Sequence, residues 1–327
     1  MSPDTPTDVD DVHRWTVPEA ADGERLDRHV ATHLDRPRNQ VRQWIEQGAV
    51  RVGGRHPKPS SPVTAGDAIE CEPPQKPVDV RVVPEEGPLR ILHADDDVVV
   101  LDKSAGVAVH PGAGRDRGTL VNFLLHRFPD ITGVGGAGRP GIVHRLDLDT
   151  TGAMVIARSE RAYRRLSEAF AERRVDKRYQ AIAYGVPQET EGTIDLPIGR
   201  HRQDRKRMAV RQDGRPALTH YVCRRSARGI AHFELDLETG RTHQIRVHLK
   251  AIHHPLVGDP VYGEARWRAL PKKQRRVFET FPRPALHAWR LGFDHPADGR
   301  PMTFEAPVPG DMRTLWEKAT GEPWALE

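Results

Sequence analysis

Cysteine, lysine and long apolar runs are all scarce in this sequence of 327 residues. The only two cysteines, Cys71 and Cys223, are too few for a disulfide framework or a Cys-rich zinc module, so we expect a protein of the reducing cytoplasm. No run approaches the roughly 20 apolar residues of a membrane-spanning helix. The first twelve residues have neither the basic nor the apolar segment of a signal peptide. We therefore expect no membrane partner.

Only nine of the 50 basic residues are lysines, and the other 41 are arginines. A GC-rich genome produces such a bias, and arginine also suits planar, bidentate contacts with phosphates and base edges. The formal net charge of +4 is distributed unevenly: residues 1–24 carry seven acids against one arginine, and residues 25–58 carry eight bases against three acids. An acidic, proline-containing stretch with little to bury is typical of disorder, so residues 1–22 are predicted to be a disordered tail.

Residues 23–72 have the pattern of a small basic module. Apolar residues at helical spacing predict two short helices, which are followed by short strands separated by glycine turns. Arg38 and Arg42 lie one turn apart on the second helix, away from its apolar stripe. The segments GERLD and GAVRV, in this order, resemble the S4 RNA-binding domain. We predict that both arginines contact RNA phosphates; the alternative is an ordinary solvated basic face.

A larger domain is expected over residues 89–327, after a proline-rich linker at residues 73–88. Strand and helix patterns alternate in this domain without the regular repeat of βαβ units, which predicts an α+β fold. Its polar loop GIVHRLDLDTTG (residues 141–152) lies between two apolar stretches and presents Asp147 and Asp149. Strand-held loops commonly carry catalytic groups, although a solvated surface turn has the same composition. Gly152 permits a tight turn at the end of the loop.

Two further segments carry chemically useful side chains. In KRYQA, Tyr179 lies in an alternating strand. In TGRTHQIRVHL, Thr242 is a plausible helix N-cap, and Ile245 and Leu249 belong to a buried stripe. Arg246 lies beside that stripe, where its guanidinium group can turn inward toward a carboxylate.

Taken together, these segments resemble the RluA/RluC/RluD-type family of RNA pseudouridine synthases. The resemblance is carried in order by AVHPG with GTLVN, HRLDLDTTG, KRYQA, and TGRTHQIRVHL with HPLVGDPVYG, and it extends over about residues 23–310. The S4-like module points to the RluD-like branch. The resemblance implies a catalytic domain built on a mixed, mostly antiparallel β-sheet with flanking helices, preceded by the small S4 domain.

The implied reaction converts uridine in RNA to its C-glycoside isomer and adds or removes nothing, so no cofactor is expected. Asp147 matches the essential aspartate of the family; whether it attacks C1′ or assists loss of the 2′ proton stays open. By resemblance, Arg246 supplies the charge that keeps this carboxylate ionised against desolvation. Tyr179 is expected to lie against the uracil ring and to serve as the base for the C5 proton.

The implied substrate must be flipped out of its stack, and several residues are expected to contact RNA. Arg145 resembles the family residue that fills the vacated space, and its planar group can stack on bases. His144 is either a structural histidine of the loop or an RNA contact. Thr150 is expected to contact RNA. A basic stretch beyond residue 199 is expected to contact the RNA backbone through Arg202, Arg205 and Arg207.

Other functions are weakly supported by the sequence. His243 and His248 are five residues apart and lack an HExxH pattern or cysteine partners, and no further acidic cluster accompanies Asp147 and Asp149, so no metal site is predicted. We expect a monomer that acts on large-subunit (23S) ribosomal RNA, either free or in an assembling 50S subunit. The alternatives are the same chemistry on transfer RNA, and a catalytically silent S4-type ribosome assembly factor.

Overall fold

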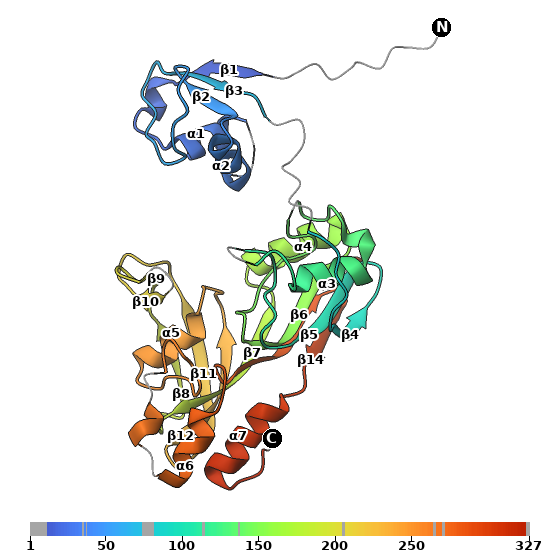
Figure 1. The fold of residues 1–327 in the computed structure, drawn as a ribbon, viewed down its shortest axis with the longest axis vertical. Helices are drawn as coiled ribbons and strands as arrows, with labels where there is room; N and C mark the ends of the chain where they lie inside the picture. Colours follow the sequence, from blue (N-terminus) through green and yellow to red (C-terminus); the bar gives the residue numbers. More distant parts are fainter. Residues whose placement is uncertain are drawn as a thin grey trace. The chain divides into compact units, whose positions relative to one another are not determined.

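The protein comprises two compact units, residues 1–79 and residues 80–327 (Figure 1). The computed structural model describes residues 12–34, 36, 38–73, 82–112, 115–136, 138–204, 207–263, 266–269 and 272–324. No helix among these residues is long and apolar enough to cross a membrane. Each unit has its own hydrophobic core, so each is described by itself.

The smaller unit packs two helices against a three-stranded sheet of order β1-β3-β2. Its elements are β1 (His13–Thr16), η1 (Glu19–Ala21), α1 (Leu26–His33), α2 (Arg38–Glu46), β2 (Val50–Val52) and β3 (Ala68–Cys71). Leu26 and Val30 of α1 are fully buried against Val41 of α2 and Ile69 of β3, as their helical spacing predicts.

The first strand corrects the prediction of a disordered tail through residue 22. β1 pairs antiparallel with β3, and Val17 is buried in the core of the unit. The acidic composition gave no sign of this short strand. Its main-chain hydrogen bonds to β3 and the burial of Val17 hold it in the unit. Residues 1–11 lie outside the described part of the chain.

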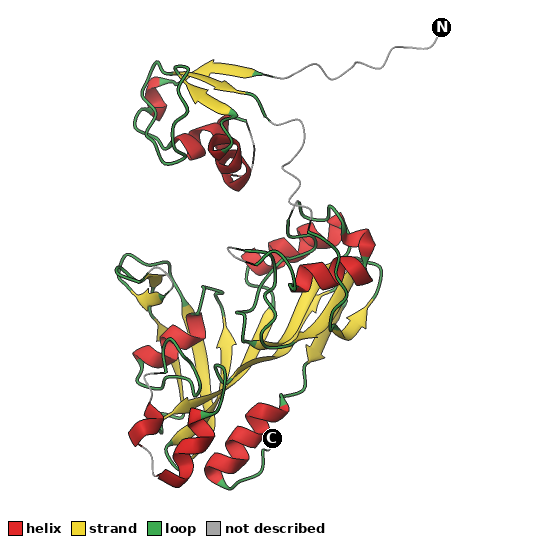
Figure 2. Ribbon diagram, in the orientation of Figure 1, coloured by secondary structure: helices red, strands yellow, loops and turns green. Residues whose placement is uncertain are grey.

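The larger unit is built on a nine-stranded sheet of order β4-β5-β6-β13-β7-β12-β11-β8, with β14 paired to β13 (Figure 2). The only parallel pair in this sheet, among the described residues, is β6 with β13. The predicted α+β class, with a mixed and mostly antiparallel sheet, is confirmed. The strands are β4 (Arg90–Ala94), β5 (Val98–Lys103), β6 (Thr151–Ala157), β7 (Asp176–Tyr184), β8 (Glu191–Asp195), β11 (Leu218–Ala227), β12 (Ile230–Leu237), β13 (Leu286–Asp294) and β14 (Pro301–Glu305). A separate hairpin joins β9 (Ile198–Arg200) and β10 (Met208–Val210). The helices are α3 (Leu120–Arg127), η2 (Pro129–Ile131), α4 (Glu160–Ala171), α5 (Gln244–Ala251), η3 (Arg266–Ala269), α6 (Lys272–Glu279) and α7 (Gly310–Thr320).

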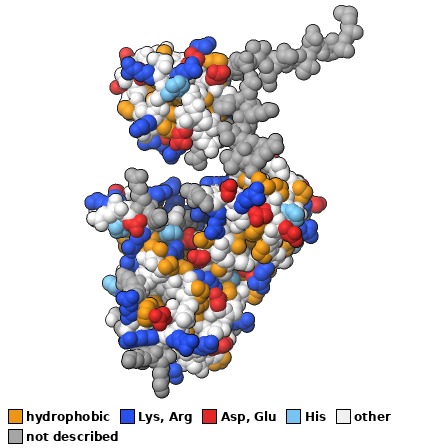
Figure 3. Space-filling view, viewed as in Figure 1, with side chains coloured by type: hydrophobic (Ala, Val, Ile, Leu, Met, Phe, Trp, Pro, Cys, Tyr) orange, Lys and Arg blue, Asp and Glu red, His pale blue; other side chains and the backbone are white. Residues whose placement is uncertain are grey.

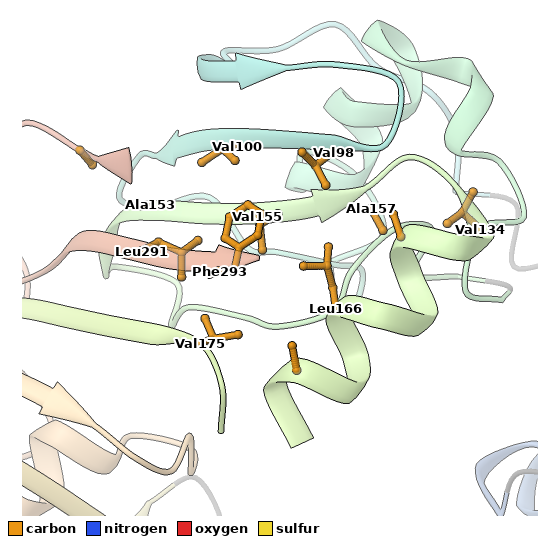
Figure 4. Close-up of a cluster of buried hydrophobic side chains, with 13 residues drawn as sticks. Val98, Val100, Val134, Ala153, Val155, Ala157, Leu166, Val175, Leu291 and Phe293 are labelled. Carbon is orange, nitrogen blue, oxygen red and sulfur yellow. The ribbon is translucent and has the colours of Figure 1, made fainter. Parts of the chain in front are cut away.

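Helices cover both faces of this sheet, which explains its continuous apolar strands. Val98 and Val100 of β5 point into one cluster with Leu166 of α4 (Figure 4). The alternate residues Val99 and Leu101 belong to a second cluster with residues of α3. In the other half of the sheet, α5 covers one face of β7 and β12, and α7 covers the opposite face. The two halves meet at β6, β13 and β7, near the loop that follows residue 141.

Part of the predicted linker packs on the larger unit. The Glu85 main chain donates a hydrogen bond to the carbonyl group of Asn122, and the Glu85 carboxylate accepts one from Gly118. Gly87 lies so close to the Phe123 ring that a Cβ there would be 2.2 Å from it. The prediction of a linker through residue 88 is therefore wrong for these residues, while residues 74–81 lie outside the described part.

Candidate active site

The loop that carries Asp147 is fixed by the neighbouring strand β6 and by a turn of its own. Ile142 bridges to Ile156 of β6, and the Ala157 amide donates to the carbonyl group of Gly141. At the other end, the Thr150 amide donates to the carbonyl group of Asp147, which closes a turn. Asp147 therefore lies on a tight turn immediately before β6.

Lys103, at the end of β5, anchors the same loop through a hydrogen bond to its main chain. Its side chain is buried, and Nζ donates to the carbonyl groups of Ser104, Val107 and Leu148, each at 2.9 Å. Burial lowers the pKa of Lys103 to about 8, against the opposing pull of Asp149 and Asp147. A buried lysine is rare, and this one fixes the residue that follows Asp147.

Gly152 does not form the expected tight turn, because it lies inside β6. Its φ is +121°, and a Cβ built on it would be 2.1 Å from the carbonyl oxygen of Ala288. This close approach comes from the parallel pairing of β6 with β13. Glycine is required here because a neighbouring strand leaves no space for a side chain.

Asp147 and Arg246 face each other in the structure. Nη1 of Arg246 donates to Oδ2 of Asp147 at 3.2 Å, although the two residues are 99 positions apart. Nε and Nη2 of Arg246 form a bidentate pair with Asp259, at 2.7 and 2.9 Å. The Asp259 side chain is fully buried, whereas that of Asp147 is 20% exposed. Arg246 is thus fixed by one carboxylate and presented to the other.

Tyr179 and Asp147 line the same pocket. Burial, and secondarily the charge of Asp147, raise the pKa of the Tyr179 hydroxyl above its usual value. A free phenolate is therefore disfavoured at neutral pH, so Tyr179 can accept a proton only if its own proton moves elsewhere. The pocket is lined by residues 145–147, Thr150, Tyr179, Leu237, residues 240–246 and Leu286.

His144 has a structural position. Its Nε2 accepts a hydrogen bond from the Val155 amide at 3.0 Å, and its ring stacks on Phe170 with centroids 4.5 Å apart. Burial lowers the pKa of His144 to about 3, which keeps it neutral. These contacts support the structural alternative for His144, which is partly exposed, and its contact with RNA stays a prediction.

Two of the residues expected to contact RNA lie at the pocket: Arg145 is exposed at its lining, and Thr150 is buried in it. Arg207 lies beside the site, with Cζ 5.6 Å from the centroid of the Tyr262 ring. Arg202 is exposed on the loop between β9 and β10. Arg205 lies outside the described residues.

The two arginines of the smaller unit are tied to acidic neighbours. Arg38 donates to both oxygens of the buried Asp27, each at 3.1 Å, and Asp27 also pairs with Arg25. Arg42 pairs with Glu46 one turn along the helix. The side chain of Arg42 is largely exposed. Nη2 of the Arg38 guanidinium group is occupied by its ion pair with Asp27.

Sequence reasoning assigned no role to Lys103 or Asp259. Their positions depend on packing between distant segments, and each is an ordinary charged residue in the sequence. A weak signal was available for Asp259, which lies in the HPLVGDPVYG segment. Among the described residues, no group of three or more His, Cys, Asp or Glu side chains could hold a metal ion.

Comparisons with known proteins agree with this architecture. A family model described as RNA pseudouridylate synthase matches residues 97–251, and the S4 domain model matches residues 24–69. An uncharacterized RNA pseudouridine synthase of Chloroflexus aurantiacus is 48% identical over 300 residues, covering 91% of each chain. Ribosomal large subunit pseudouridine synthase D of Escherichia coli O6:H1 is 44% identical over 310 residues, covering 92% of each chain.

A solved structure supports the same assignment. Human RNA Pseudouridylate Synthase Domain Containing 1 is similar with a TM-score of 0.54 and 30% sequence identity, over 68% of this chain and 86% of that one. The family, the S4 match and the fold lead to one conclusion: the chain belongs to the RNA pseudouridine synthase family, whose members isomerise uridine in RNA, and carries an S4 domain.

Proposed function

We propose that this protein isomerises specific uridines of large-subunit (23S) ribosomal RNA, with Asp147 as the catalytic carboxylate. The observation that carries the proposal is the pairing of Asp147 with Arg246 inside a pocket that Tyr179 also lines. The relatives named ribosomal large subunit pseudouridine synthase D, which match over most of the chain, support this choice of RNA.

The arrangement of charges suits glycoside chemistry. Asp259 neutralises Arg246 on one side, so the guanidinium group donates to Asp147 without being drawn away from its position. Among the described residues, the Asp147 carboxylate accepts one hydrogen bond, from Arg246, and it goes to Oδ2. Oδ1 is therefore left to attack C1′ or to accept the 2′ proton.

The reaction balances within the substrate. The N1–C1′ bond breaks, a C5–C1′ bond forms, C5 loses one proton and N1 gains one. No redox or group-transfer reagent is consumed, and acid–base groups supply the proton movements. Tyr179 is proposed to lie against the uracil ring and to take part in loss of the C5 proton, with its own proton passing to another group.

RNA must deliver an extruded nucleotide to this pocket. Stacking in the RNA opposes extrusion by roughly a few kcal/mol, and the exposed Arg145 is proposed to fill the vacated space. Lys and Arg side chains border a hollow on the face shown in Figure 3, where they suit phosphate binding. We propose that the protein acts as a monomer in the cytoplasm, on free rRNA or an assembling 50S subunit.

The test is Asp147→Ala, which leaves Arg246 paired with Asp259 and so preserves the fold. Tritium release from C5-labelled uridine in a 23S rRNA fragment is expected to fall at least 1,000-fold, on the order seen when a catalytic group is removed. RNA affinity should stay within about tenfold, because phosphate contacts dominate it. Asp195→Ala, on the exposed end of β8, is the matched control.

Residual turnover near that of the wild type would remove Asp147 from the mechanism. A wild-type protein that binds rRNA without releasing tritium would instead support the assembly-factor alternative. Mapping pseudouridines in the rRNA and transfer RNA of a strain lacking the gene separates the two substrate classes.

A further inference from the structure

His243 occupies an unusual backbone conformation beside the candidate active site. It precedes α5 with φ 57° and ψ 23°, in the left-handed region that is uncommon for residues other than Gly, although Asn, Asp and His adopt it more often than the rest. Its side chain makes no capping hydrogen bond to the helix. Helix capping therefore does not account for a histidine in this conformation. Strained residues of this kind commonly mark functional positions.

The strained backbone directs the imidazole into the site. Nε2 of His243 lies 3.9 Å from Oδ2 of Asp147, the same oxygen that Arg246 contacts. His243 lines the pocket, and its side chain is only 20% exposed. The distance exceeds that of a hydrogen bond, but such contacts are often long before substrate binds.

Tyr262 determines which nitrogen of His243 carries the proton. The Tyr262 hydroxyl oxygen accepts a hydrogen bond from the Met208 amide at 2.8 Å, so its own proton is available for donation. Nδ1 of His243 is 2.9 Å from that oxygen, and we infer that it accepts this proton. In the neutral imidazole the remaining proton is then on Nε2, which faces Asp147. Burial lowers the pKa of His243 below its ordinary value, which favours the neutral form.

We propose that His243 is a positioning residue: its neutral Nε2–H closes on Oδ2 of Asp147 when a flipped uridine fills the pocket. With Arg246 and His243 both on Oδ2, the carboxylate is held so that Oδ1 faces the ribose. This inference rests on the proposed function. It assigns the left-handed backbone a purpose, since a relaxed helix start would direct the imidazole elsewhere.

Two substitutions of His243 distinguish a structural role from a positioning role, because the two roles predict opposite orders of activity for the variants. Asparagine tolerates the left-handed backbone best and can accept the Tyr262 proton, but it is too short to reach Asp147. Glutamine is less suited to this backbone, but its amide can take the place of Nε2. A purely structural role therefore predicts that His243→Asn is at least as active as His243→Gln. The proposed role predicts the reverse.

The control is His253→Asn. His253 follows α5 with φ 66°, so it has the same residue type in the same kind of backbone, yet it is exposed and does not line the pocket. Single-turnover tritium release at saturating enzyme is measured for all variants, together with rRNA affinity and the thermal midpoint.

We expect His243→Asn to lose 10- to 100-fold in the single-turnover rate, the effect of one hydrogen bond to a charged group. Its rRNA affinity and thermal midpoint should match those of the wild type. His243→Gln should recover to within about threefold of the wild type, and His253→Asn should be unchanged. If the wild type is active and His243→Asn reacts at the same rate, the role of His243 is overturned while the proposed function stands. An equal loss of rate in the Asn and Gln variants would have the same consequence. A wild type that isomerises no uridine would overturn the proposed function as well.

Discussion

Single residues at this site act through the charges that surround them. Asp147 is one of many carboxylates in the chain, and what sets it apart is that it faces a guanidinium group already neutralised by Asp259. Tyr179 is likewise defined by its neighbours, because burial and Asp147 together raise the pKa of its hydroxyl. The tyrosine can therefore remove a proton from C5 only in a step that also moves its own proton.

Tyr179→Phe tests this role, since it keeps the ring and removes only the hydroxyl. We expect the rate of isomerisation to fall about 100-fold, at the lower end of general acid–base effects, with rRNA affinity unchanged. Loss of the C5 proton should then limit the rate, so a deuterium isotope effect at C5 should appear. Tyr184→Phe, on the same strand but in the opposite core, is the control. An isotope effect that is absent from Tyr179→Phe would contradict the assignment.

At the scale of elements, the active site is assembled from segments that the chain connects only distantly. The loop before β6 supplies Asp147, β7 supplies Tyr179, and α5 supplies Arg246. β5 supplies Lys103, which donates a hydrogen bond to the carbonyl group of Leu148 in the loop. The loop thus depends on a charge that the fold keeps buried.

Lys103→Met tests this anchor through the pH dependence of stability. Burial lowers the pKa of Lys103 to about 8, whereas lysine in an unfolded chain has a pKa of about 10.4. Between these values the unfolded chain holds a proton that the folded chain has lost, so the lysine's contribution to the free energy of unfolding rises with pH. From pH 8 to pH 10 the wild type should gain about 1.4 kcal/mol per pH unit relative to the variant.

Urea unfolding of both proteins across this range gives the difference directly, because all other titrating groups are shared. The variant should also isomerise uridine more slowly at every pH, since the carbonyl group of Leu148 in the loop has lost its hydrogen bond to Nζ. A stability difference that does not change with pH would show that Lys103 titrates as an exposed lysine does.

On the scale of the whole molecule, the chain forms two units with separate cores. The smaller unit buries its own cluster around Leu26 and Ile69, and the candidate active site is formed entirely by residues of the larger unit. Residues 25–58 concentrate positive charge in the smaller unit. We infer that the smaller unit contributes RNA affinity and choice of site, while the larger unit carries the chemistry.

Deletion of residues 1–79 tests this division. The remaining chain should fold with an unchanged thermal midpoint by circular dichroism and retain Asp147-dependent tritium release. Its rRNA affinity should fall at least tenfold, and the dependence of affinity on salt should become weaker, because fewer phosphates are neutralised. Filter binding at two salt concentrations measures both effects. An insoluble product, or an unchanged salt dependence, would show that the units do not act separately.

The sequence by itself determined the features that depend on neighbouring residues. Apolar spacing predicted the helices that contain Leu26 and Leu249, and the composition of residues 141–152 marked the loop that carries Asp147. The α+β class followed from the alternation of strand and helix patterns. These inferences succeeded because burial imposes a local period on the side chains of each element.

The tertiary structure alone decided which distant residues meet. It placed Arg246 against both Asp147 and Asp259, buried Lys103 beneath the loop, and turned His144 into the fold. It also showed that β1 belongs to the smaller unit and that Gly152 is required by the backbone of β13. None of these has a local period, because each depends on contacts between separate segments that only the packing of the folded chain brings together.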